Sequence, residues 1–137
     1  MYRVRYRGSR PEAERKLPAR VIHLGVDVCY RLGVLRRAGY EIQECANLIE
    51  FRSALRSGID AGAVFVNDSN GRVSPDAFSI ARQSTSAPII LFPNSGRTYH
   101  IEQIDLIVPC FTPPDKWLRD VANLIVQSRA LRACSQA

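Results

Sequence analysis

Two adjacent polar residues, Asn67 and Asp68, follow a short apolar run and are the first candidates for chemistry. The run Ala63–Val66 has the continuous apolar character of a parallel strand that is buried on both faces. A third polar residue, Asp27, lies shortly after the β-rich run Arg20–Leu24. Ligands of open parallel sheets gather at the carboxyl ends of the strands. The pattern predicts that any functional site lies at this edge.

The segments that position these residues alternate between strand and helix patterns. Five strands alternating with about five helices predict an α/β fold with one doubly wound parallel sheet and helices on both faces. The central strand should be 63–66, with 89–91 beside it. The predicted strands are 20–24, 40–45, 63–66, 88–92 and 106–108. The predicted helices are 28–38, 48–58, one that begins at Ser74-Pro75, a short one within 98–103, and a final one opened by residues 112–115 that carries Trp117, Val121, Leu124, Ile125 and Leu131.

Three of the helix starts have recognisable capping signals. Asp27 is predicted to cap the helix from Val28 to Ala38. Asn47 and Glu50 resemble a capping box. Ser74 precedes a proline, which favours the first helical position.

Length and charge indicate one globular domain with a basic tail. The 137 residues suffice for a single core, and no apolar run has the ~18 residues that a membrane helix needs. Residues 1–20 hold seven basic and two acidic residues, whereas the other 117 hold twelve and eleven. We therefore predict a tail at 1–19, a domain at 20–137 and a cytoplasmic protein. The alternation Tyr2-Arg3-Val4-Arg5-Tyr6-Arg7 leaves nucleic-acid binding by the tail as a distant alternative.

Most other reactive side chains are predicted to be structural. Four scattered cysteines without a CxxC pair, and two histidines, argue against a zinc site and predict buried free thiols. His23 is expected in the core as part of the first strand. Trp117 and Phe111 are expected to be core aromatic residues. No metal site and no catalytic residue are predicted.

The order and spacing of several segments resemble the receiver domain of bacterial response regulators. The likeness extends from Arg20 to about Arg129 and implies a flavodoxin-like five-stranded fold. The segments that carry it are 35–42 (Leu-Arg-Arg-Ala-Gly-Tyr-Glu-Ile), 51–58, 59–67, 87–91 (Ala-Pro-Ile-Ile-Leu) and 111–113 (Phe-Thr-Pro).

This resemblance implies a phosphorylation site, from which the sequence departs. In such domains an acidic pair after the first strand and an aspartate after the third hold Mg²⁺, and the aspartate accepts a phosphoryl group. A Ser or Thr after the fourth strand and a lysine after the fifth complete the site. By position, the acidic pair corresponds to Gly25-Val26, with Asp27 just beyond, and the acceptor corresponds to Asn67 or, one residue later, to Asp68. The hydroxyl residue corresponds to Pro93, with Ser95 nearby, and the lysine corresponds to Pro109-Cys110.

These departures predict a degenerate receiver rather than a phosphoryl-transfer enzyme. The leading hypothesis is a stand-alone, phosphorylation-independent module of a two-component or phosphorelay system that acts by protein binding. Its expected partners are a histidine kinase, another receiver or a separate output protein, and a homodimer is left open. The alternative is a conventional response regulator that is phosphorylated on Asp68 with Mg²⁺ held by Asp27. No cofactor is expected except Mg²⁺ under that alternative.

Overall fold

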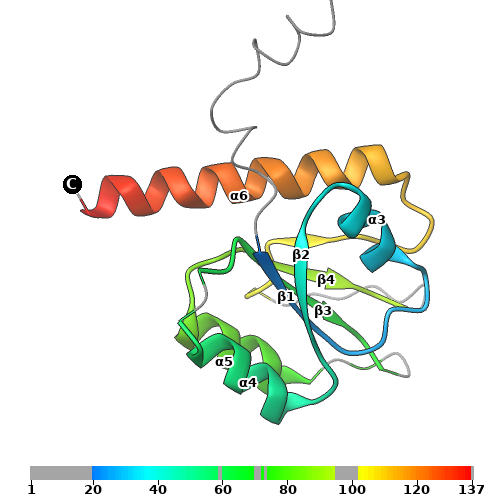
Figure 1. Cartoon of the computed structure of the whole chain (residues 1–137), viewed down its shortest axis with the longest axis horizontal. Coiled ribbons are helices and arrows are strands. Elements are labelled where there is room, and N and C mark those ends of the chain that lie inside the picture. The colour runs from blue at the N-terminus through cyan, green and yellow to red at the C-terminus, as the bar shows by residue number, and fades with distance from the viewer. Residues whose placement is uncertain (1–19, 59, 70–71, 73, 95–101, 137) are drawn as a thin grey trace, which may run out of the picture.

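Five parallel strands form the single sheet of this computed structural model, which describes residues 20–58, 60–69, 72, 74–94 and 102–136 (Figure 1). The strands are β1 (Arg20–Leu24), β2 (Glu41–Cys45), β3 (Ala63–Asn67), β4 (Ile89–Phe92) and β5 (Leu106–Ile107). Their order is β2-β1-β3-β4-β5, and every pair is parallel. The predicted parallel sheet, with the 63–66 strand in the centre and the 89–91 strand beside it, is confirmed.

Helices cover both faces of the sheet (Figure 1). One face is covered by α4 (Leu48–Arg56) and α5 (Pro75–Ser84), and the other by α3 (Arg31–Arg37) and α6 (Pro114–Gln136). The central strands β3 and β4 are buried along their whole length because both of their faces are covered. Around Phe92, the ring centroids of Phe65 and Trp117 lie 4.8 and 5.4 Å away. Among the described residues, no helix is long and apolar enough to cross a lipid bilayer.

The helix ends follow local capping chemistry where side chains reach the backbone. The Asn47 side chain accepts a hydrogen bond from the Glu50 N–H at 2.9 Å, and Glu50 Oε1 accepts one from the Ala46 N–H at 2.8 Å. These bonds satisfy amide groups that the first turn of α4 leaves without a partner. Ser74 precedes α5, and its side chain makes no capping bond.

Several local predictions were wrong. The helix predicted to begin at Val28 begins at Arg31, because the backbone at Tyr30 is left-handed with φ 57°. Phe111 is 99% exposed rather than in the core. Of the cysteines, only Cys45 is buried. The predicted tail at 1–19 and most of the short helix predicted within 98–103 lie outside the described residues.

Candidate functional site

Strand register brings the predicted site residues to one edge of the sheet. Leu24, the last residue of β1, pairs with Val66, and Asn67 pairs with Phe92 at the end of β4. Gly25 therefore lies against Asn67. A Cβ atom added to Gly25 would lie 3.1 Å from the Asn67 Cβ, and Gly25 has φ 110°, which disfavours any other residue. A side chain at position 25 would therefore require a strained backbone and a small shift of Asn67.

The Asn67 side chain is fully engaged in hydrogen bonds. Its Nδ2 donates to the Phe92 carbonyl oxygen at 2.9 Å and to Asn94 Oδ1 at 2.8 Å. Its Oδ1 lies 2.5 Å from His23 Nε2. Since Oδ1 can only accept, His23 carries its proton on Nε2. Both donors of the amide and its oxygen are thus satisfied by the protein.

Asn94 connects three segments of this edge. Its backbone N–H donates to Asp68 Oδ1 at 2.7 Å. Its side-chain Nδ2 donates to the Val26 carbonyl oxygen at 2.9 Å and to the Asp68 carbonyl oxygen at 3.0 Å. Asp68, only 2% exposed, is consequently held against the start of the loop after β4.

A buried arginine, Arg31, lies beside these amides. Its side chain donates to the Val108 carbonyl oxygen at 2.9 Å, to the Pro93 carbonyl oxygen at 3.0 Å and to Asn94 Oδ1 at 3.2 Å. The guanidinium also lies 4.6 Å from the centre of the Phe92 ring, which is cation–π contact distance. With 4% of Arg31 exposed, its charge is enclosed by backbone dipoles at the ends of β4 and β5.

Asp27 supplies the negative charge next to Arg31. Its Oδ2 accepts a hydrogen bond from the Leu32 N–H at 2.8 Å, and its Oδ1 lies 3.5 Å from Arg31 Nε. Both side chains of the pair are 5% exposed. Asp27 thus stabilises the start of α3 and neutralises Arg31.

The remaining predicted positions contribute backbone or lie elsewhere. The Pro93 carbonyl oxygen accepts hydrogen bonds from Arg31 and from Cys110 Sγ. The Val26 side chain is exposed. Pro109 places no side-chain donor in the site, and Ser95 lies outside the described residues.

Sequence reasoning missed Arg31 and Asn94 as site residues. It placed Arg31 only inside a predicted helix, and it predicted no role for the Asn94 side chain. The one available signal was the spacing of Asp27 and Arg31, which are four residues apart, as helical ion pairs commonly are. The partners of Arg31 are mainly backbone carbonyl oxygens, which no sequence motif marks.

The residues at this edge do not fit Mg²⁺. This hard cation prefers several carboxylate oxygens in octahedral geometry. Gly25 offers no side chain, Val26 is apolar, and Asp27 is directed to Arg31 and the Leu32 N–H. Within the part of the chain that the structure describes, no group of three or more His, Cys, Asp or Glu side chains is placed to hold a metal ion.

His23 should make stability depend on pH. Burial lowers the pKa of its imidazole from the usual 6.5, despite the opposing hydrogen bond to Asn67. Within the described part of the chain, its buried Nδ1 has no hydrogen-bond acceptor that would stabilise a second proton on the ring. As pH falls below about 6.5, the unfolded chain therefore binds the proton first, and stability decreases by up to about 1.4 kcal/mol per pH unit. Urea unfolding at several pH values should show a steeper loss for the wild type than for His23→Met. If the free energy of unfolding of both proteins fell equally with pH, His23 would not be the group responsible.

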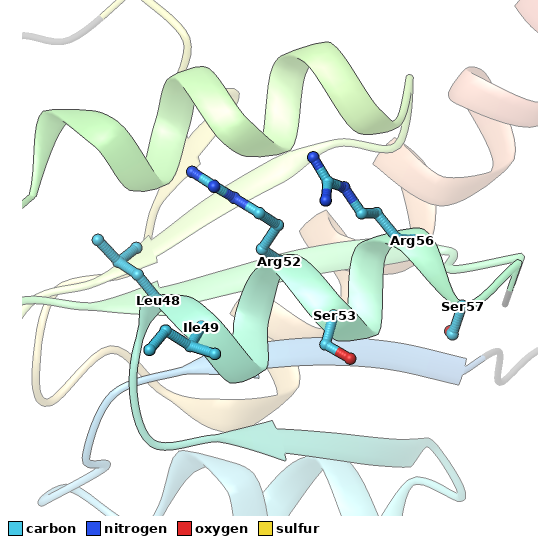
Figure 2. A pocket seen from close by; sticks show the side chains of 6 residues that line it. All are labelled: Leu48, Ile49, Arg52, Ser53, Arg56 and Ser57. Carbon is cyan, nitrogen blue, oxygen red and sulfur yellow. The ribbon is translucent and has the colours of Figure 1, made fainter.

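A hollow on the outer side of α4 has none of the cluster residues in its lining. It is lined by Leu48, Ile49, Arg52, Ser53, Arg56 and Ser57. In Figure 2, the side chains of Arg52 and Arg56 project on the side of α4 that faces α5, with Ile49 on the other side. Among the described residues, neither guanidinium has an ion-pair partner.

Comparison with known proteins identifies the fold. No protein-family model matches the sequence, and no curated protein matches it. A CheY-like response regulator receiver domain from Methanospirillum hungatei superposes with a TM-score of 0.64 at 11% identity, covering 83% of this chain and 98% of that one. The receiver domain of the hybrid histidine kinase CckA gives 0.57 at 20% identity, covering 77% and 98%. An adenylate cyclase structure from Rhodopirellula baltica gives 0.71 at 12% identity, covering 88% and 96%.

The sheet order β2-β1-β3-β4-β5, with helices on both faces, matches the flavodoxin-like fold of the CheY-like receiver domain. At such low identities the likeness concerns the fold and carries no residue roles. The chain has the fold of response regulator receiver domains, of the flavodoxin-like class.

Proposed function

We propose that this chain is a receiver-like signalling module of the two-component type that acts by binding other proteins, without phosphorylation and without enzymatic activity. The observation that carries the proposal is the Asn67 side chain, whose amide is engaged by His23, Phe92 and Asn94. Asn67 stands where the resemblance places the phosphoryl acceptor. An amide is not a nucleophile toward phosphorus, and this one has no oxygen directed to an incoming group.

The charged groups around Asn67 also support this proposal. Phosphoryl transfer needs positive charge that is placed where the transition state develops negative charge. Arg31 is the buried cation at this edge, and its hydrogen bonds go to the carbonyl oxygens of Val108 and Pro93. Its charge is therefore already neutralised by Asp27 and solvated by the backbone.

The alternative, phosphorylation of Asp68 with Mg²⁺ held by Asp27, receives less support. Asp27 Oδ2 accepts the Leu32 N–H and Oδ1 faces Arg31. To bind a metal, Asp27 would have to leave a buried cation without its counter-charge. That loss is expensive for a buried ion pair.

Binding through the hollow on α4 would favour an acidic partner. Arg52 and Arg56, which have no ion-pair partner among the described residues, line this hollow together with the exposed side chain of Ile49. A partner surface that combines carboxylates with an apolar side chain would complement these two arginines and Ile49. A kinase, another receiver or a separate output protein could present such a surface, and a second copy of the chain is an alternative partner.

A magnesium titration tests whether the site keeps metal chemistry. The amide signals of Gly25, Asn67 and Asp68 would be followed by NMR as MgCl₂ is added to the full chain, with KCl of equal ionic strength as control. We expect equal small shifts with both salts. Saturable shifts that are specific to Mg²⁺ and centred on these amides would support the conventional response regulator instead.

A further inference from the structure

Two cysteines meet at the same edge of the sheet, outside the Asn67 network. Cys29 lies in the loop between β1 and α3, and Cys110 lies between β5 and α6. Their Sγ atoms are 3.1 Å apart, although 81 positions separate them in sequence. Cys110 Sγ also donates to the Pro93 carbonyl oxygen at 3.0 Å. Both residues are partly exposed, so a small reagent has access to the pair.

The backbone beside each cysteine is held in an unfavourable conformation. Tyr30, next to Cys29, has φ 57°, and Phe111, next to Cys110, has φ 71°. Residues other than glycine rarely adopt such angles, because the Cβ atom crowds the backbone. The rings of both residues are exposed, so core packing does not compensate for this strain. The two strained turns instead place the neighbouring sulfur atoms in contact.

We propose that Cys29 and Cys110 form a site of reversible disulfide modification, with a low-molecular-weight disulfide such as oxidised glutathione as the oxidant. A protein disulfide has an S–S length near 2.05 Å, so the sulfurs must approach by about 1 Å. Both side chains sit on loops, where so small a movement leaves the strands unchanged. Disulfides of this kind in reducing compartments are typically transient and regulatory.

The chemistry is a thiol–disulfide exchange in two steps. One cysteine, as the thiolate, attacks a sulfur of the oxidant, so that a mixed disulfide forms and one small thiol leaves. The second cysteine then attacks the bonded sulfur of the first, and the second small thiol leaves with the other proton. Two electrons pass from the cysteine pair to the oxidant, which becomes two thiols.

The surroundings of Cys29 indicate how the rate should depend on pH. Burial raises the pKa of the Cys29 thiol, and the hydrogen bond with Cys110 raises it further. The attacking species is the thiolate, so the disulfide should form faster as pH rises above neutral. The bond would also tie together the two loops that carry the exposed rings of Tyr30 and Phe111.

The two other cysteines provide controls. Burial raises the pKa of Cys45 to about 11, so this thiol should remain unmodified in the folded protein. Cys134 is exposed on α6 and far along the chain from the pair. Cys134→Ser should leave the disulfide unchanged, and Cys29→Ser should abolish it.

The test incubates the full chain, as wild type and Cys134→Ser, with oxidised glutathione and measures intact mass and peptide maps. We expect a mass lower by two hydrogen atoms, a Cys29–Cys110 linked peptide, a higher melting temperature and full reversal by dithiothreitol. The peptide map of the wild type decides the outcome even if Cys29→Ser does not fold. Glutathione adducts alone, disulfide-linked dimers alone, or free thiols at both positions would overturn the proposal.

Discussion

Replacing Arg31 with alanine is expected to lower the free energy of unfolding by roughly 3 to 5 kcal/mol, the cost of breaking a buried ion pair. The change removes the donors to the carbonyl oxygens of Val108 and Pro93. It also leaves the Asp27 carboxylate, which is 5% exposed, without its positive neighbour. The contact with the Phe92 ring is lost as well. Each loss acts at the junction of β4, β5 and α3.

Urea unfolding of Arg31→Ala and a matched control, Arg36→Ala, would measure this effect. Arg36 pairs with Glu44 at the surface, where both side chains are half exposed. Its removal should change stability by at most about 1 kcal/mol, as is usual for exposed pairs. A similar small effect of Arg31→Ala would show that the buried network does not stabilise the fold.

Restoring an aspartate at the acceptor-equivalent position should destabilise the protein. Asn67→Asp replaces the amide Nδ2 with an oxygen, which cannot donate to the Phe92 carbonyl oxygen or to Asn94 Oδ1. Two buried acceptors then face a buried carboxylate. Unsatisfied buried groups cost about 1 to 3 kcal/mol each, so we expect a loss of roughly 2 to 4 kcal/mol. The loss should shrink at low pH, where the carboxyl group is protonated and can donate once.

The same chemical change at Asn47 serves as the control for Asn67→Asp. Asn47 is exposed, and its side chain only accepts a hydrogen bond from the Glu50 N–H. An aspartate performs this capping role equally well, so Asn47→Asp should be nearly neutral. Equal stability of both variants and the wild type would show that the Asn67 amide is not needed as a donor.

Much of the fold could be predicted because its central strands are unambiguous. Runs of apolar residues in β3 and β4 indicate strands that are buried on both faces, and the structure buries every residue in them. The start of α3 was mispredicted because the backbone at Tyr30 is left-handed, with φ 57°, which delays the helix to Arg31. Asp27 consequently caps at a distance, through a hydrogen bond from the Leu32 N–H. Phe111 was expected in the core on aromatic character alone, but it sits in a loop with φ 71°.

The structure brings the predicted site positions to one edge of the sheet, but the sequence did not predict that Arg31 would fill that edge. Gly25, Asn67 and Pro93 could be placed from the strand ends and from the family resemblance. Arg31 could not, because its main partners are the backbone carbonyl oxygens of Val108 and Pro93. Every residue has such an oxygen, so only the three-dimensional arrangement reveals that these two point at one guanidinium.

The most direct test of a phosphorylation-independent module is the intact mass of the full chain after incubation with acetyl phosphate and Mg²⁺. We expect no gain of a phosphoryl group, because Asn67 is an amide engaged in hydrogen bonds and Asp27 pairs with Arg31. The missing charge stabilisation corresponds to several kcal/mol of barrier, or orders of magnitude in rate. An acid-stable, base-labile gain of one phosphoryl group that requires Mg²⁺ and disappears in Asp68→Asn would contradict the account and identify a working phosphoacceptor.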